Sequence, residues 1–409
     1  MNLSRERDLN ADGVSSVIGA VLIFATVILV AGQMQTGIVP ENRLSRELKH
    51  DGKVSSQFES IDNKVLSSAM NEEVGSAPIK MTTSYSQGTL MGFWPKIQPP
   101  SPGSELSLGE FSNEIEVKNV RAIGDGSTFW PDNNGAAKPC KNLDHCYNSS
   151  VLTYTVDYNE VSSEETPDRL YENTVMYEEY PNGHVDVLNE QSLIKNKNVN
   201  LVALSGDFTE NTAASTTVDT TPVSSPAQSV AVRSDDDPIT LELPTRLSEG
   251  EWRDILSNQL GSNGGQISSL DVSNDVLTLK LQRGTTYSLK MAKVHLSADD
   301  DRSKIDDEKG AYIAWAGNKK TTVKEGEVNV IKAQVRDRMN NPVTGEVVEA
   351  KAVDGNNDCI GDFDSGVGNC GGWKQPGKKI SGDDGEVTFF YEAPEVAEDK
   401  DISISLNLK

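Results

Sequence analysis

The stretch Val14–Met34 reads VSSVIGAVLIFATVILVAGQM and is the one part of this chain that is too apolar to be comfortable in water. At about 1.5 Å per helical residue, such a run can cross a hydrocarbon core of about 30 Å. The sequence after it is polar and acidic, so this segment determines where the rest of the protein lies. We expect a single membrane-spanning helix at 14–34, with the bulk of the chain outside the cell.

The flanks of this run bear on whether it is retained. A removable secretory signal has a basic start, a shorter apolar centre and a small-residue cleavage site. Here Arg5 and Arg7 are outnumbered by nearby acidic residues, and Ala31-Gly32-Gln33 makes a poor cleavage site. The sequence therefore favours an anchor that stays on the protein. An uncleaved anchor and a removed signal are two possible fates of this run.

The start of the run carries a recognisable motif. Asp12-Gly13 precedes Val14-Ser15-Ser16-Val17-Ile18-Gly19, which resembles the class III signal of archaeal type IV pilin-like proteins. This resemblance implies that a prepilin-type peptidase removes residues 1–13 by cutting between Gly13 and Val14. The chain departs from the family at Ser16, where many halophilic archaeal members have proline, and at Ile18, where bacterial pilins carry a glutamate used in subunit registry. These departures bear on assembly into a filament with sister subunits more than on anchoring.

The composition describes a strongly acidic chain. Its 409 residues include 62 acidic and 38 basic ones, for a formal charge of -24. Such a charge argues against nucleic acid as a partner. Acidic surfaces keep proteins soluble in concentrated salt, where repulsion is screened within a few ångströms. The charge thus points to a halophilic source.

The cysteines form two local pairs, Cys140 with Cys146 and Cys359 with Cys370, without the Cys-x-x-Cys spacing of zinc or redox sites. Two disulfides would suit an exported protein, and four buried thiols are the alternative. Asn148 begins the acceptor sequence Asn148-Ser149-Ser150 and is a candidate glycosylation site.

A helical stalk is expected at 35–76, because apolar residues recur there at mostly three- and four-residue spacing: Leu44, Leu48, Val54, Phe58, Ile61 and Val65. Glu47, Asp51 and Gly52 weaken its first half, and a kink near Gly52 is expected. The stripe packs either on the protein's own next domain or against sister subunits.

A β-rich ectodomain is expected at 77–296, where short β-branched segments alternate with turn residues. The predicted strands are 115–117, 151–156, 185–187, 199–204, 230–232 and 239–243, and a hairpin joins 276–281 to 287–291. Ser248 and Glu251 form a capping box for one covering helix that ends at Gly261. Loops are expected at 94–102 and 209–226.

The last hundred residues form a separate unit. An acidic linker at 297–310 precedes segments at roughly ten-residue spacing, which predict a β-sandwich over 311–409. The motifs Val335-Arg-Asp337, Asn341-Pro-Val343 and Asp383-Asp-Gly-Glu-Val-Thr-Phe389 resemble those of bacterial Ig-like domains of the invasin type. The expected fold is therefore mainly β, with two N-terminal helices and a terminal Ig-like sandwich.

No residue pattern indicates an enzyme, a cofactor or a metal. His50, His145, His184 and His295 lack ligand spacing, and no P-loop, Gly-x-Ser-x-Gly or dinucleotide motif occurs. The run Asp354–Asp364 alternates oxygen side chains in the manner of a calcium loop, but Cys359 and Ser365 occupy positions where an EF-hand needs glycine and glutamate. A disulfide-closed acidic loop is the more direct interpretation of that run.

These observations favour a non-catalytic, membrane-anchored cell-surface protein that uses its ectodomain for adhesion or envelope contacts. The alternatives are a surface hydrolase and a small-ligand receptor, each with its site in 77–296. A cluster of acids and a histidine around one pocket would support the hydrolase, and a deep apolar pocket would support the receptor.

Overall fold

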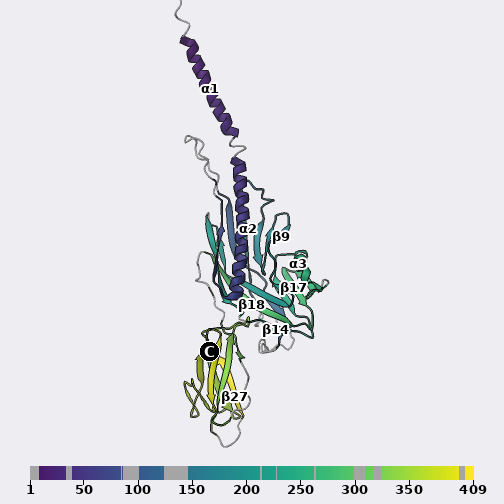
Figure 1. The fold of residues 1–409 in the computed structure, drawn as a ribbon, viewed down its shortest axis with the longest axis vertical. Helices are drawn as coiled ribbons and strands as arrows, with labels where there is room; N and C mark the ends of the chain where they lie inside the picture. The colour runs from purple at the N-terminus through teal and green to yellow at the C-terminus, as the bar shows by residue number, and fades with distance from the viewer. Residues whose placement is uncertain are drawn as a thin grey trace, which may run out of the picture.

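A computed structural model describes residues 9–33, 39–83, 85, 101–123, 146–211, 214–226, 228–261, 264–298, 305, 309–316, 324–395 and 401–409. The fold is mainly β, as the sequence predicts. The molecule is elongated, with one isolated helix at one end and a small β unit at the other (Figure 1).

Two long helices begin the chain, α1 (Leu9–Gln33) and α2 (Val39–Asn71). Figure 1 shows α1 extending away from the rest of the molecule, whereas α2 runs along the body. Pro40 lies in the first turn of α2, where its missing N–H removes no helical hydrogen bond. Among the described residues, no helix combines the length and the hydropathy that crossing a membrane requires.

Three sheets build the body. In each sheet, strands that are distant in the sequence lie next to one another. The seven-stranded sheet contains β1 (Gly75–Lys80), β13 (Ser215–Ser224), β18 (Tyr287–Ala298), β11 (Asn198–Ser205) and β10 (Ile194–Lys195). In addition, β14 (Val230–Arg233) pairs with β18, and β4 (Arg121–Ala122) pairs with β14. The six-stranded sheet contains β12 (Phe208–Glu210), β2 (Gly103–Glu110), β6 (Ser150–Asp157), β7 (Asp168–Glu172), β8 (Val175–Glu179) and β9 (Val185–Val187). The five-stranded sheet contains β16 (Ile267–Ser273), β17 (Val276–Leu281), β15 (Thr240–Pro244), β3 (Ile115–Lys118) and β5 (Cys146–Tyr147).

The body has two apolar cores, and strands β11 and β18 contribute side chains to both. From β18, Ala292, Val294 and Leu296 enter the first core, and Tyr287, Leu289 and Met291 enter the second. Because side chains alternate across a strand, the two sets point to opposite faces. β11 divides its side chains between the same two cores, and it pairs with β18 in parallel. The body is therefore one unit rather than two separable halves.

Helix α2 closes the first of these cores. Val54, Phe58, Ile61 and Val65 are at most 1% exposed and pack among residues of β1, β13 and β18. Full burial of each large apolar side chain contributes about 1.5–3 kcal/mol. Leu44 and Leu48, at the other end of the stripe, are 38% and 56% exposed. The larger part of the stripe thus packs on the chain's own sheets, and α2 is continuous through Gly52.

A short helix covers the second core. α3 (Glu249–Ile255) begins with the predicted capping box between Ser248 and Glu251, and it buries Trp252 completely. A 3-10 turn (Ser257–Gln259) follows α3, so the α-helix ends before Gly261.

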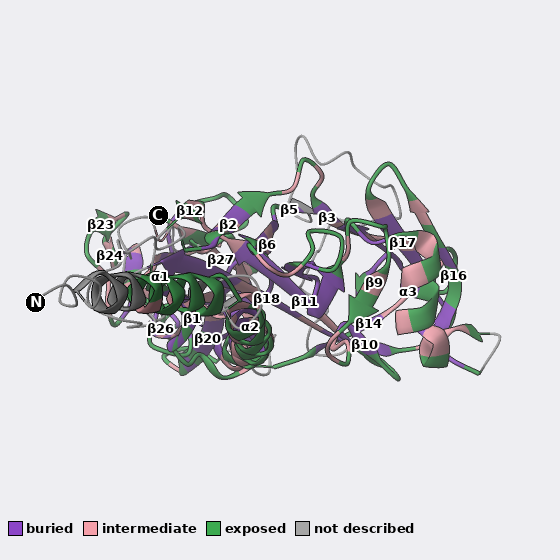
Figure 2. Cartoon of the chain, turned by 90° about the horizontal axis from the view of Figure 1, so that it is seen from above, coloured by how far each residue is buried: buried purple, intermediate pink, exposed green. Residues whose placement is uncertain are grey.

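The C-terminal unit has two antiparallel sheets that share one apolar cluster. One sheet contains β19 (Tyr312–Trp315), β20 (Val328–Arg336), β26 (Glu386–Glu392) and β22 (Asp362–Phe363). The other contains β25 (Gly377–Ile380), β21 (Val347–Asp354) and β27 (Ile402–Leu408), and a small ribbon is formed by β23 (Asn369–Cys370) and β24 (Trp373–Lys374). Seen from above, the buried residues lie along the strands, while α1 presents an exposed surface (Figure 2).

The predicted hairpin between 276–281 and 287–291 is wrong. β17 pairs with β15 and β16, whereas β18 belongs to the seven-stranded sheet. The connection at Arg283 and Gly284 bonds to the segment 234–236, through Gly284 N to Ser234 O at 2.9 Å and Arg283 Nη1 to Asp236 O at 2.8 Å. These bonds direct the chain from one sheet into the next.

The predicted loop at 209–226 is also wrong in its main part. Residues 208–210 form β12, and 215–224 form β13, which lies between β1 and β18. Threonine is β-branched and suits a pleated strand, so a Ser- and Thr-rich segment need not be a loop. The loop predicted at 94–102 lies outside the described residues, except for 101 and 102.

Candidate functional site

The predicted processing residues lie in the first half of α1. The backbone is helical through Asp12, Gly13 and Val14, and their side chains lie outside the described residues. From Ile18 onward the apolar side chains are exposed, with Phe24 at 67% and Leu22 at 62%. Figure 2 shows this helix exposed along its described length. An apolar helix whose side chains are exposed presents a surface that water solvates poorly.

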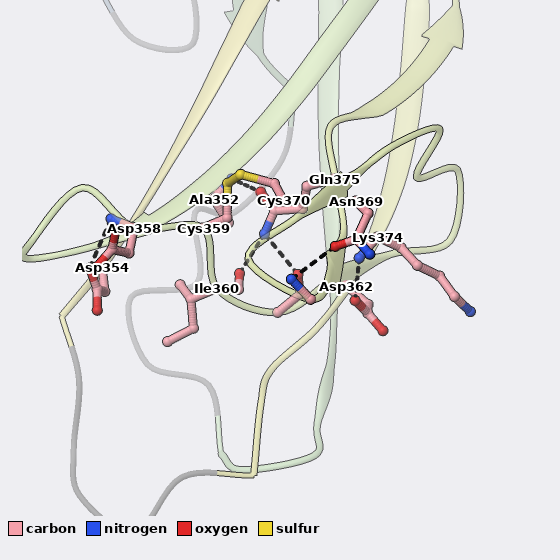
Figure 3. The surroundings of a disulfide bond; sticks show 12 residues. Ala352, Asp354, Asp358, Cys359, Ile360, Asp362, Asn369, Cys370, Lys374 and Gln375 are labelled. Carbon is pink, nitrogen blue, oxygen red and sulfur yellow. Dashed lines mark hydrogen bonds between the residues drawn. A yellow bond between two sulfur atoms is a disulfide. The ribbon is translucent and has the colours of Figure 1, made fainter.

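The disulfide between Cys359 and Cys370 is confirmed, with a Cα–Cα distance of 5.8 Å. It closes a loop that Gln375 supports from within (Figure 3). The Gln375 side-chain amide donates to Ile360 O and Gly361 O, each at 2.7 Å, and its oxygen accepts from Ala352 N at 3.0 Å. The other predicted pair cannot be described, because Cys140 and the side chain of Cys146 lie outside the described residues.

The acidic residues of this loop bond to the backbone. Asp354 accepts N–H bonds from Asn356 and Asp358 at 2.9 and 3.1 Å, and Asp362 accepts one from Lys374 at 2.7 Å (Figure 3). In the described parts of the chain, no group of three or more His, Cys, Asp or Glu residues is arranged to hold a metal ion. The loop therefore uses these carboxylates to fix its own turns.

The three histidines within the described residues lie in different parts of the fold. His50 lies buried on α2, His295 lies buried in β18, and His184 is exposed beside Asp186, with Nε2 and Oδ1 3.0 Å apart. Burial lowers the pKa of His50, whose ring bonds to the Tyr158 hydroxyl and to Lys80 O at 2.7 and 2.9 Å. His145 lies outside the described residues. His50 lies among carboxylates, but it is buried against the body and does not line the surface hollow at the start of β2 and the end of β6.

A largely buried group of polar and ionisable residues holds α2 against the body. We call it the α2 seam: Glu47, His50, Asp51, Ser55, Arg169 and Glu178. Glu47 is fully buried, and its carboxylate accepts backbone N–H bonds from Asn159, Glu160 and Val161 at 3.1, 2.9 and 2.8 Å. The Tyr85 hydroxyl donates to the same carboxylate, and burial raises the pKa of Tyr85 to about 12. These four donors satisfy the Glu47 carboxylate inside the protein.

Arg169 on β7 is the cationic centre of the α2 seam. Its side chain is 0% exposed, and Nη2 lies 2.8 Å from both Asp51 Oδ1 and Glu178 Oε1. Its Nε donates to Ser55 Oγ at 3.2 Å. Breaking a buried pair by removing one partner leaves an uncompensated charge, so this contact fixes the position of α2. The sequence held a signal for it, because positions 47, 50, 51 and 55 continue the apolar stripe in helical register.

A second buried carboxylate lies between β7 and the segment before α3. Glu172 is 0% exposed, and burial raises its pKa to about 7. Its carboxylate accepts from Thr245 Oγ1 at 2.5 Å and from Arg246 N at 3.1 and 3.2 Å. Trp252 Nε1 donates to the same threonine oxygen at 2.8 Å. The group links the β7–β8 hairpin to α3.

The C-terminal unit is joined to the body through the turn at 337–341. Met339 is 4% exposed and packs in the second core of the body. Asn341 Nδ2 donates to Met291 O at 2.8 Å and to Ser224 Oγ at 2.6 Å, and Ser224 Oγ donates to Asp337 Oδ2 at 2.6 Å. These contacts hold the two parts in a fixed relation.

The glycosylation candidate Asn148 is exposed between buried neighbours. It lies between β5 and β6, and Tyr147, Ser149 and Ser150 beside it are 4%, 2% and 3% exposed. Ser149 Oγ accepts from Leu204 N at 3.2 Å. Asn148 is thus the exposed residue of this segment.

A shallow surface hollow lies where β2 begins and β6 ends. It is lined mainly by polar residues, among them Ser104, Glu105, Thr155 and Asp157. It is open to solvent, and so it does not have the enclosed shape expected of a small-ligand site.

No family profile matches this sequence, and no curated protein is significantly similar to it.

Proposed function

We propose that this chain is a non-catalytic cell-surface protein, held in a membrane by the apolar run 14–34. The observation that carries the proposal is the exposure of the apolar side chains on α1. Eight large ones between Ile18 and Val30 are 48–67% exposed: Ile18, Val21, Leu22, Ile23, Phe24, Ile28, Leu29 and Val30. A lipid environment would remove this surface from water at about 25 cal/mol per Å².

The place of α1 in the molecule supports the same proposal. It extends from one end of the body, opposite the C-terminal unit (Figure 1). Apolar residues on a helix that is separate from the body can enter a bilayer without disturbing either core. The body and the C-terminal unit would then lie outside the membrane, with the bulk of the chain extracellular.

The α2 seam suits an anchored protein. A helix that connects an anchor to a domain must hold its position when the domain is pulled. Glu47 and Arg169 tie the first half of α2 to the body by charge-assisted bonds, and Phe58 and Ile61 hold the second half by apolar packing. On this proposal, α2 belongs to the displayed domain instead of forming a free stalk.

The outer end would carry the contacts for adhesion or for other envelope proteins. We propose that 311–409 is an Ig-like sandwich of the invasin type, supported by its two sheets around one core. Its outer surface includes Val328, Val330 and Phe390, which are 50%, 48% and 43% exposed. The joint at Met339 and Asn341 would hold this unit at a fixed distance from the anchor.

Pilin-type processing is part of the proposal. A prepilin-type peptidase would cut between Gly13 and Val14 and leave α1 on the mature chain. Membrane retention does not depend on this cut, and assembly with sister subunits is a further step.

Mass spectrometry of the mature N-terminus tests the processing. The expected first residue is Val14. An intact Met1 would contradict the cleavage and leave the anchor in place, whereas a first residue beyond Gln33 would contradict the anchor itself.

A further inference from the structure

We infer that Asn148 carries an N-linked glycan and that the glycan is added before strand β6 pairs with β2. The inference rests on the proposed export of the chain, because the glycan would be transferred outside the cytoplasm. It concerns a covalent modification that the display function does not itself require.

The sequence offers one acceptor in the mature protein. Asn148-Ser149-Ser150 is the only Asn-x-Ser/Thr sequence without proline at x after residue 13; Asn2-Leu3-Ser4 lies within 1–13. A glycan on the displayed protein would therefore have a single position.

The fold keeps that position available to a glycan after folding. Asn148 is exposed, while the residues on both sides are pinned: Tyr147 donates from its hydroxyl to Arg338 O at 2.7 Å, and Ser149 O accepts from Phe111 N at 2.9 Å. A bulky group on this asparagine would point into solvent and displace no core residue.

The same fold withholds the rest of the acceptor sequence. The transferring enzyme recognises the hydroxyl residue two positions after the asparagine. Ser150 is 3% exposed and pairs with Glu110 as the first residue of β6. An enzyme cannot read Ser150 in the native sheet, so transfer must come first.

Transfer of the glycan is a substitution at its anomeric carbon and requires no oxidant. The Asn148 side-chain nitrogen bonds to the anomeric carbon of a glycan carried on a lipid phosphate. The bond from that carbon to the phosphate oxygen breaks, the lipid phosphate leaves with the electron pair, and the amide loses one proton.

The first test is the mass of the peptide that contains Asn148, from full-length protein isolated from its native membranes. The expected result is a glycan mass on this residue. It should be lost in Asn148→Gln and Ser150→Ala and kept in Ser150→Thr, which retains the hydroxyl. A bare Asn148 in the wild type would overturn the inference.

Protease treatment of intact cells separates this outcome from failure of the proposed function. Protein that is cut at the surface but bare at Asn148 overturns only the glycan. Protein that is protected in intact cells overturns the export on which both depend.

The second test concerns the order of events. Unmodified full-length protein, produced without the glycan, is incubated with native membranes that supply the transferring enzyme and the lipid-linked glycan, either folded or freshly diluted from urea. Because native access requires opening of β6, transfer to the unfolded chain should be at least about tenfold faster. Equal rates would overturn the proposed order.

Discussion

Replacing Glu47 by alanine should loosen the first half of α2 from the body. The substitution removes the acceptor for three backbone N–H groups, on Asn159, Glu160 and Val161, and for the Tyr85 hydroxyl. A buried donor left without a partner costs about 1–3 kcal/mol. Water can reach part of the 159–161 turn, where Asn159 is exposed, so we expect a total loss of about 3 kcal/mol rather than the full sum.

Urea unfolding of the full chain in detergent measures this loss. With a urea slope of about 3 kcal/mol per M, the midpoint should fall by about 1 M. Glu59→Ala is the matched control, because Glu59 lies on the exposed side of the same helix. Glu47→Gln keeps one acceptor oxygen and should fall between the two.

The reasoning fails if Glu47→Ala and Glu59→Ala lower the midpoint equally. It also fails if Glu47→Ala changes the free energy of unfolding by less than about 1 kcal/mol, the median value of an exposed ion pair. Either result would mean that the seam contacts do not hold α2.

Three further predictions concern the other buried contacts. Burial raises the pKa of Glu172 from 4.5 to about 7, so the folded state holds a proton that the unfolded state has lost, and the free energy of unfolding should fall by about 3 kcal/mol as pH rises from 4.5 to 7. Glu172→Gln should remove that part of the pH dependence. Parallel plots of unfolding free energy against pH for the wild type and the variant would refute it. Met339→Ala should speed amide hydrogen exchange at 337–343 about tenfold or more, whereas Val328→Ala, at an exposed position, should not. Equal exchange rates in the two variants would show that the joint between the C-terminal unit and the body does not depend on Met339. Reduction of the Cys359–Cys370 disulfide should lower the unfolding free energy of the C-terminal unit by about 3 kcal/mol, because the two cysteines are 11 residues apart in sequence. Urea unfolding with and without reductant measures this loss, and an unchanged midpoint would contradict the prediction.

Local chemistry in the sequence predicted local structure well. The capping box at Ser248 and Glu251 starts α3, and the pair Cys359 and Cys370 forms a disulfide. Strand β17 has the predicted bounds, Val276–Leu281. In each case the residues that determine the feature are near one another in the chain.

Pairing between distant segments could not be read in the same way. β17 and β18 follow each other in sequence with a turn between them, yet they enter different sheets because β18 pairs in parallel with β11. The Thr-rich β13 has a partner on each side, and a strand with two partners tolerates a composition that alone suggests a loop.

The α2 seam was missed for a physical reason. Acidic residues within an apolar stripe weaken the pattern of an amphipathic helix, and Glu47 and Asp51 were interpreted in that way. Their partners, the 159–161 backbone and Arg169, are more than a hundred residues away. The helical register places these charges on the inward face of α2, but only the folded chain shows which groups pair with them.

Alkaline carbonate extraction of native membranes tests the central claim most directly. If the run 14–34 anchors the protein, the full-length mature chain should remain in the sedimented membranes and be released only by detergent. Release of the intact chain into the carbonate supernatant, with the apolar run still present by mass, would contradict the membrane anchor.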